Sequence, residues 1–233
     1  MSEPLNQKAG TADFDVLHFG EEREPVVVID DFSSDPQRLR DLARRANYKP
    51  GGNHYPGHRA PAPADYLGER MPTLRSALSE VFGAVQGADL ASCSFSLVTT
   101  PPDQLTPIQR LPHFDGTDPG ILAVLHYLCE PNEGGTSFYR HRTTGFETIS
   151  ADRLNAYDAA LQAEIKASGL PPAAYFSGAT YQYEQIGRVE AAFNRLVIYR
   201  GWRLHSGEIP KASEIGKPGA EPRLTVNTFL MGR

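Results

Sequence analysis

The apolar positions of the chain follow strand patterns more often than helix patterns. Residues 25–30 and 121–128 are apolar almost without interruption, which is typical of strands buried on both faces. Residues 223–230 instead alternate between apolar and polar side chains, which predicts a strand with one polar face. Additional strands are expected at 91–100, 136–140 and 193–199. The chain is therefore predicted to be mainly β.

Helical spacing is found in the connections between these strands. Apolar residues recur at i, i+3, i+4 and i+7 from Leu39 to Ala46, and Asp35 followed by Pro36 is typical of a helix start. A second helix is predicted for residues 72–82. Because strands buried on both faces need a cover outside their sheet, we expect these two helices to pack there.

A third helix is predicted in the second half of the chain, at residues 150–169. Ser150 is its expected N-cap, and Gly169 is expected to end it. Because this helix interrupts a β-rich region, we expect it to be an insertion packed outside the sheets. The polar residues 1–24 are expected to be irregular, and residues 1–233 are expected to form one domain.

Composition and charge exclude several classes of partner. The 233 residues are 40% hydrophobic and 22% charged, as in ordinary soluble globular proteins. The net charge of −5, without a long run of one sign, argues against nucleic acid as the main partner. No window has the length and apolar character of a membrane span, and the N-terminus lacks a signal-peptide pattern. The two cysteines, Cys93 and Cys129, stand far apart in the sequence and show no metal-ligand spacing. Because this pattern does not indicate a disulfide scaffold, we expect a cytoplasmic protein.

The strongest chemical signal is the triplet His113-Phe114-Asp115. Alternate residues of an extended segment share a face, so His113 and Asp115 are expected to point to one place. His205, which follows the predicted strand 193–199, is the best candidate for a third ligand. Two histidines and one carboxylate, with other positions left open, form the arrangement that holds catalytic non-haem Fe(II).

Three of the other histidines are interpreted as structural residues. His126 shares a face of the strand 121–128 with apolar residues and is expected in the core or under the covering helices. His54 and His58 are four residues apart, but a Pro-Gly pair between them prevents a regular helix. We expect residues 49–63 to form a loop at the rim of a pocket, and a second metal site there is the less favoured alternative.

The last predicted strand carries a polar face formed by Arg223, Thr225 and Asn227. An arginine that faces the interior of a β fold needs an anionic partner. A guanidinium beside a hydroxyl suits a carboxylate, because the guanidinium binds both oxygens and the hydroxyl adds a donor. The alternative is that Arg223 lies at the mouth of the fold, in water or against Glu221.

Two further segments are each open to two interpretations. Residues 140–142, Arg-His-Arg, either form a solvated strand edge, which we favour, or contact an anionic substrate. Residues 171–183 are rich in small and aromatic side chains. They form either a lid or substrate wall, or an ordinarily packed loop.

Taken together, these segments resemble the Fe(II)- and 2-oxoglutarate-dependent dioxygenases, and within them the branch similar to the prolyl 4-hydroxylases. The resemblance covers chiefly residues 108–142 and 193–230. The matching segments are His113-Phe114-Asp115, Leu125-His126-Tyr127-Leu128, Glu133-Gly134-Gly135-Thr136, Asn194-Arg195-Leu196-Val197 leading to His205, and Arg223-Leu224-Thr225.

The resemblance implies a double-stranded β-helix, which is a jelly-roll or cupin-like barrel with helices packed on one sheet. It also implies Fe(II) held by His113, Asp115 and His205, with 2-oxoglutarate and O2 as cosubstrates. The helix at 150–169 is not a standard part of the prolyl hydroxylases.

The resemblance further implies how the cosubstrate is held. By position, Tyr127 matches the tyrosine that helps the counterpart of Arg223 hold the distal carboxylate of 2-oxoglutarate, and Thr225 lies beside it. The separation between His205 and Arg223 is longer than is common in the family. Arg195 and Arg203 are therefore kept as alternative anchors for the carboxylate.

The implied activity is hydroxylation of an unactivated C–H bond of an amino acid, a peptidyl side chain or a small metabolite, with release of succinate and CO2. Asp115 favours hydroxylation over halogenation, because related halogenases lack this carboxylate and bind a halide in its place. The alternatives are a non-redox cupin-like barrel that binds a metal or ligand, and a catalytically silent family member. Arg223 and Thr225 favour the oxygenase over a metal-binding barrel, which has no need of a carboxylate anchor.

Overall fold

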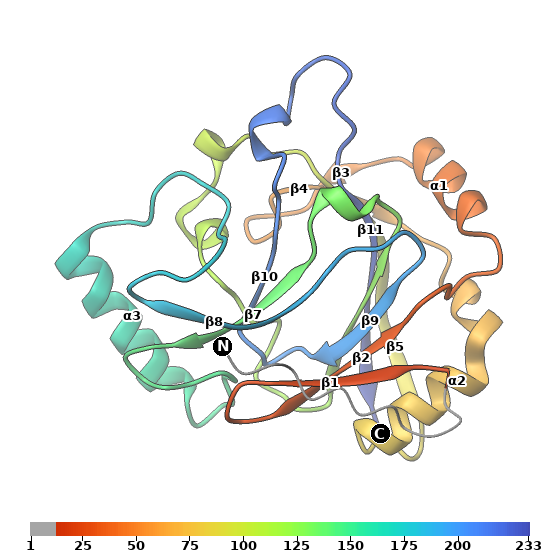
Figure 1. Cartoon of the computed structure of the whole chain (residues 1–233), viewed down its shortest axis with the longest axis horizontal. Helices are drawn as coiled ribbons and strands as arrows, with labels where there is room; N and C mark the ends of the chain where they lie inside the picture. The colour runs from red at the N-terminus through yellow and green to blue at the C-terminus, as the bar shows by residue number, and fades with distance from the viewer. Residues whose placement is uncertain (1–12) are drawn as a thin grey trace.

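Two antiparallel β-sheets with helices at their periphery form the protein, as seen in a computed structural model that describes residues 13–233 (Figure 1). The large sheet has the strand order β1-β2-β9-β6-β11-β5-β4-β3, and the small sheet has the order β10-β7-β8. The strands are β1 (Asp15–Phe19), β2 (Glu24–Ile29), β3 (Lys49–Pro50), β4 (Gly57–Pro61), β5 (Ala88–Val98), β6 (Ile121–Tyr127), β7 (Thr136–His141), β8 (Tyr183–Val189), β9 (Leu196–Arg200), β10 (His205–Gly207) and β11 (Leu224–Gly232). The α-helices are α1 (Pro36–Arg45), α2 (Met71–Ser76) and α3 (Leu154–Ser168). The prediction of a mainly β fold with packed helices is confirmed.

Two apolar layers lie on opposite faces of the large sheet. On β6, Leu125 and Tyr127 belong to the layer between the two sheets, which also contains Phe138 of β7. Val124, on the other face of β6, belongs to the layer that the large sheet shares with α1 and α2. This division follows the alternation of side chains along a strand and agrees with the predicted faces.

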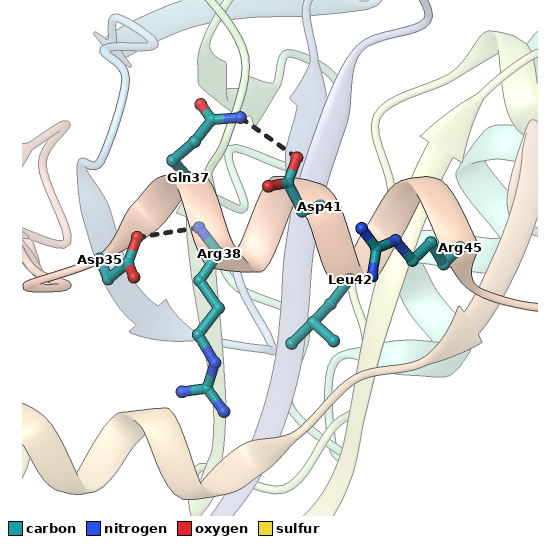
Figure 2. A pocket seen from close by; sticks show the side chains of 6 residues that line it. All are labelled: Asp35, Gln37, Arg38, Asp41, Leu42 and Arg45. Atoms are coloured by element: carbon teal, nitrogen blue, oxygen red, sulfur yellow. Dashed lines mark hydrogen bonds between the residues drawn. The ribbon is translucent and has the colours of Figure 1, made fainter.

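The first helix, α1, begins as its sequence predicts. Oδ1 of Asp35 accepts a hydrogen bond from the backbone N–H of Arg38 at 2.9 Å and so caps the helix. Leu39 and Ala43 are buried on its inner face. Leu42, which was expected on the same stripe, is 37% exposed and lies among polar side chains lining a shallow surface pocket (Figure 2). The apolar stripe is therefore narrower than predicted.

The helix predicted for residues 72–82 is divided into two forms. α2 ends at Ser76, and the chain continues as a π-helical turn over Ala77–Val81. Leu74 and Leu78 are both buried, so the apolar stripe is maintained where the helix changes its hydrogen bonding.

Short strands occur in two segments that were predicted to be irregular. β1 lies within residues 1–24, of which residues 1–12 are outside the described part of the chain, and it pairs with β2. β3 and β4 lie within residues 49–63, where β4 pairs with β5. β8 was not predicted either. Only two of its seven residues, Tyr183 and Val189, are buried, so it has no apolar pattern. These strands lie at or beside sheet edges, where burial leaves a weak pattern in the sequence.

The prediction of a solvated strand edge at residues 140–142 is wrong. β7 is the central strand of the small sheet and pairs with both β10 and β8. Nη2 of Arg140 lies 2.6 Å from Oε1 of the buried Glu147, and Nη1 lies 3.3 Å from Oε2 of Glu184. His141 is fully buried. Arg140 and His141 therefore belong to the internal packing of the small sheet, whereas Arg142, just beyond the end of β7, is exposed.

α3 occupies most of the region predicted to be helical at residues 150–169. It ends before Gly169, whose φ of +83° favours glycine. It begins one turn later than expected, because the hydroxyl of Ser150 donates to Asp152 instead of capping the helix. The hydroxyls of Tyr157 and Tyr183, 2.7 Å apart, attach α3 to the small sheet. In the described part of the chain, no helix combines the length and apolar character that crossing a bilayer requires.

His126 lies in the core beneath the helices, as predicted. Its ring is fully buried, Nε2 is 3.1 Å from Oδ1 of Asn194, and the ring stacks on that of Tyr66 at 5.5 Å. Burial lowers the pKa of His126 to about 4, while the hydrogen bond with Asn194 acts in the opposite direction. The folded protein therefore holds this ring uncharged at neutral pH.

We expect His126 to make the protein less stable as the pH falls below 6.5. The unfolded chain protonates this ring near pH 6.5 and the folded protein only near pH 4, so the free energy of unfolding decreases across that interval, by about 3 kcal/mol at most. Urea denaturation at pH 7 and pH 4 measures the loss. In His126→Gln, which keeps a polar group near Asn194, the loss should be smaller by that amount. Equal losses in the two proteins would show that another group is responsible.

Candidate metal centre

Backbone pairing brings His113 and His205 together. The two residues form an isolated antiparallel bridge in which the N–H of each donates to the carbonyl of the other at 2.8 Å. Two residues further on, the N–H of Asp115 donates to the carbonyl of Gly201 at 2.6 Å. Both ends of the triplet are thus held against the segment that leads into β10.

This close approach requires glycine at position 201. A Cβ on Gly201 would lie 2.7 Å from Cγ2 of Ile121 and 3.2 Å from Cβ of Asp115. A larger residue would therefore displace Ile121 or move Asp115 away from its present position.

The three predicted metal ligands converge on one place. Ligand atoms of His113, Asp115 and His205 all lie within 4.8 Å of one another. Carboxylate oxygens of Asp115 are 3.9 Å from Nε2 of His113 and 3.6 Å from Nε2 of His205. Two imidazole nitrogens and one carboxylate oxygen suit a divalent first-row metal ion. In residues 13–233 no other group of three such side chains has this spacing.

A hydrogen bond prepares His205 as a ligand, and a lowered pKa keeps the rings of both histidines uncharged. Nδ1 of His205 lies 2.8 Å from the carbonyl oxygen of Arg203, which can only accept, so Nδ1 carries the proton and Nε2 has the free lone pair. Desolvation lowers the pKa of His113 and of His205 to about 4, and in His113 the neighbouring His205 adds to the effect. Both rings are therefore uncharged at neutral pH. The side chain of His113 is 48% exposed and that of His205 is 5% exposed, so the centre is open on the side of His113.

A row of polar side chains crosses the large sheet. Arg59 of β4 is paired with Ser96 of β5, Ser96 with Thr225 of β11, and Thr225 with Tyr127 of β6. Residues paired directly across antiparallel strands point to the same face. All four side chains, called the polar row below, therefore lie on the face of the sheet where Tyr127 packs between the two sheets.

Arg223 faces the interior without an acidic partner. The residue is 7% exposed, its Cζ lies 5.3 Å from the ring centroid of Tyr127, and Nη2 donates to the carbonyl of Gly135 at 3.3 Å. Its Nε is buried and has no hydrogen-bond partner in the described residues. Glu221, the alternative partner considered from the sequence, lies 3.9 Å from Arg40 instead. The alternative that places Arg223 at the mouth of the fold is therefore wrong.

The hydroxyls beside Arg223 already have partners. The hydroxyl of Tyr127 is 2.7 Å from Oγ1 of Thr136, and that of Thr225 donates to Oδ1 of Asn227 at 2.6 Å. The extra donor expected from Thr225 is therefore engaged within the strand, and the guanidinium of Arg223 supplies the free N–H group.

The two alternative anchor residues have partners elsewhere. Arg195 forms a bidentate pair with Asp30, with N–O distances of 2.6 and 2.9 Å. Arg203 donates from Nη1 to the carbonyl of Glu24 at 2.7 Å. Arg203 also has a buried Nη2 without a partner in the described residues, but its charge is balanced by the nearby Glu24, Glu147 and Glu22. Arg223 is therefore the candidate that lies beside Tyr127 without an acidic partner in the described part of the chain.

The two loops of uncertain role, residues 49–63 and 171–183, are both attached to β5 or to the residues that follow it. Neither His54 nor His58 joins a group of potential metal ligands in the described residues. In segment 171–183, the hydroxyl of Tyr175 donates to the carbonyl of Thr100 at 2.7 Å, which ties this segment to the end of β5.

Arg59 and Tyr55 were not predicted as residues of the site. Both stand in the Gly-, Pro- and His-rich stretch 49–63, where the sequence does not indicate that β4 will pair with β5. Only the strand register brings Arg59 into the polar row, so no local motif could have identified it.

The chain is similar to solved structures at low sequence identity. HygX from Streptomyces hygroscopicus, solved with nickel and 2-oxoglutarate bound, is 13% identical with a TM-score of 0.50, over 89% of this chain and 82% of that chain. The epimerase SnoN, solved with Fe3+, alpha ketoglutarate and nogalamycin RO, is 14% identical with a TM-score of 0.48, over 91% of this chain and 80% of that chain. The likeness to HygX confirms the expected fold, a double-stranded β-helix.

By sequence, the chain matches a family model but no curated protein. A family model described as "Family of unknown function (DUF6445)" matches residues 11–230. Since that match spans almost all of the described fold, the chain belongs to the DUF6445 family.

Proposed function

We propose that the protein is a non-haem Fe(II)- and 2-oxoglutarate-dependent dioxygenase, similar to the prolyl 4-hydroxylases. Its expected reaction is hydroxylation of an unactivated C–H bond in an amino acid, a peptidyl side chain or a small metabolite. The observation that carries the proposal is the convergence of His113, Asp115 and His205 in a fold that also buries the guanidinium of Arg223 without an acidic partner in the described residues. The free thiols of Cys93 and Cys129 support a cytoplasmic setting.

The residues present fit both the metal and the cosubstrate. An octahedral Fe(II) bound by His113, Asp115 and His205 would keep three positions for other ligands. The proton on Nδ1 of His205 leaves Nε2 free to coordinate the metal. The buried Nε of Arg223 lacks an acceptor, which a carboxylate of 2-oxoglutarate would supply.

When bound, Fe(II) with 2-oxoglutarate and O2 supplies the oxidising chemistry, with succinate and CO2 as co-products. The protein supplies position and exclusion of water. Arg223 would hold the distal carboxylate, and the ring of Tyr127 beside it would keep that end of the cosubstrate in place. Tyr199, whose ring lies 4.9 Å from that of His205, and Phe138 form apolar walls near the centre. Asp115 would occupy the position that a halide needs, so hydroxylation is favoured over halogenation.

The proposal is tested by adding Fe(II) and then 2-oxoglutarate to the anaerobic protein. We expect the visible charge-transfer band of the chelate to appear, followed by succinate formation when O2 is admitted with a suitable substrate. Metal binding without the band would favour the non-redox metal- or ligand-binding barrel. The band without any succinate formation, even in the slow reaction without substrate, would favour a catalytically silent protein.

Arg223→Ala is expected to weaken 2-oxoglutarate binding by about 10- to 100-fold, because the distal carboxylate would lose a charge-assisted hydrogen bond. Titration of the charge-transfer band with 2-oxoglutarate measures this change. Fe(II) affinity in the absence of 2-oxoglutarate should change little, since Arg223 does not belong to the ligand set.

Arg195→Ala is the matched control for this experiment. It removes the same charge, but from a side chain that pairs with Asp30 outside the polar row. Its 2-oxoglutarate affinity should stay close to that of the wild type. If both variants weaken the cosubstrate equally, a general effect of charge would replace the proposed anchor.

A further inference from the structure

The proposed function gives no role to the guanidinium of Arg59, which lies on the inner face of the large sheet. The residue belongs to the polar row and is separated from Thr225 by a single strand, β5. It therefore shares the inner face with the groups that would hold the cosubstrate. Its strand, β4, is separated from β6 by β11 and β5 in the large sheet.

Arg59 is as poorly paired as Arg223. Its Nε is buried without a hydrogen-bond partner in the described residues. Asp115, the acid of the metal centre, lies against His113 and His205 rather than forming an ion pair with Arg59. Burying a guanidinium nitrogen without a hydrogen-bond acceptor costs free energy. A bound ligand that supplies the acceptor would remove this cost.

The orientation of Arg59 is fixed before any ligand arrives. Its Cζ lies 4.2 Å from the ring centroid of Tyr55. Around Tyr55 the loop is closed by the hydrogen bond from the N–H of Gly51 to the carbonyl of Gly57, at 2.8 Å, and Nε2 of Gln109 donates to the carbonyl of Asn53 at 3.0 Å. A stacked and preorganised guanidinium loses little conformational freedom when it binds an anion.

Arg59 and Arg223 act on different parts of the site. The Cζ of Arg223 lies 5.3 Å from the ring centroid of Tyr127, whereas the Cζ of Arg59 lies 4.2 Å from that of Tyr55. Both charges also act on Tyr55. Burial raises the pKa of Tyr55 to about 12, and the charges of Arg223 and Arg59 act against this rise. Arg223 thus lies on the side of Tyr127, and Arg59 lies at the other end of the polar row.

We propose that Arg59 binds a carboxylate of the substrate that is oxidised, so that the substrate is a carboxylic acid such as a free amino acid. The inference rests on the proposed function, in which 2-oxoglutarate uses one carboxylate at the metal and the other at Arg223. A single guanidinium stacked on a phenol ring suits a planar monoanion, because its two parallel N–H groups match the two oxygens of a carboxylate. The neutral hydroxyl of Tyr55, buried without a partner in the described residues, adds a donor for the same group.

The test uses the anaerobic full-length protein with saturating Fe(II) and 2-oxoglutarate. The probes are the free L-amino acids, the matching amino acid carboxamides, and tripeptides with free or amidated C-termini. Binding is followed by the change in the charge-transfer band and by calorimetry. We expect at least one free acid to bind, and its carboxamide to bind about 10- to 100-fold more weakly. Tripeptides distinguish a free amino acid from the C-terminal residue of a peptide as the source of the carboxylate.

Variants at position 59 identify the group that recognises the carboxylate. Arg59→Gln should lose the preference for the acid over the carboxamide, and Arg59→Lys should recover part of it, while the chelate band with 2-oxoglutarate persists in both. Equal binding of acid and carboxamide by the wild type, an unchanged preference in Arg59→Gln, or a chelate band with no binding of any probe would each overturn the assignment. Failure of the wild-type band itself would instead overturn the proposed function.

Discussion

His113→Ala is expected to abolish productive metal binding and, with it, the charge-transfer band of the 2-oxoglutarate chelate. His113 supplies one of only three protein ligands, and the remaining pair, Asp115 and His205, cannot define one face of an octahedral ion. Loss of groups that merely orient metal ligands already lowers affinity by 10- to 100-fold, so removal of a ligand should lower Fe(II) affinity by more than about 100-fold. Calorimetric titration with Fe(II) under anaerobic conditions measures the effect.

His58→Ala is the control for this variant. His58 is exposed, and its Nδ1 lies 2.7 Å from Oγ1 of Thr99 rather than in the metal centre. The control should bind Fe(II) and form the band as the wild type does. A normal band in His113→Ala would mean that the three converging side chains are not the metal centre.

Most of the fold could be predicted because its central strands carry strong patterns. β6 is buried on both faces and β11 alternates, so their positions and the faces of their side chains follow from the sequence. β1, β3 and β8 lie at sheet edges, where the requirement for apolar residues is relaxed. Their existence depends on pairing with distant strands, which a local pattern does not encode.

The group of side chains that could hold a metal was predictable because two of its members stand in one triplet, His113-Phe114-Asp115. The choice of His205 depended on the expected fold, and a backbone bridge pairs this residue with His113. Arg59 could not be found in this way, because it reaches the site through the register of β4 on β5. The engagement of the hydroxyl of Thr225 by Asn227 likewise depends on rotamers rather than on spacing.

The metal centre is joined to a buried ionic network through Arg203. The carbonyl of Arg203 accepts the hydrogen bond that fixes the His205 ring, while its side chain is buried near acidic groups. Burial lowers the pKa of Arg203 to about 10, and the nearby Glu24, Glu147 and Glu22 act against this shift. The carboxylates that stabilise the interior charge thus also support the backbone that orients a metal ligand.

Glu147 is the acid on which this network depends most, and Glu147→Ala is expected to lower the free energy of unfolding by about 3–5 kcal/mol. The residue is 1% exposed. Its Oε1 accepts from Nε of Arg140 at 2.9 Å and from the backbone N–H of Glu21 at 2.9 Å, and its Oε2 accepts from the N–H of Glu22 at 3.1 Å. Removing the carboxylate leaves these donors and the charge of Arg140 without their buried partner. Urea denaturation of the metal-free protein measures the change.

Glu184→Ala tests whether the expected loss of stability in Glu147→Ala depends on the burial of that carboxylate or only on its charge. Glu184 also contacts Arg140, with an Oε2–Nη1 distance of 3.3 Å, but its side chain is 43% exposed. An exposed ion pair contributes at most about 1 kcal/mol, so this variant should unfold at nearly the same urea concentration as the wild type. If the two alanine variants lose similar stability, the network is no stronger than an ordinary surface ion pair. A larger loss in Glu147→Ala, accompanied by weaker Fe(II) binding, would show that the same carboxylate maintains both the fold and the position of His205.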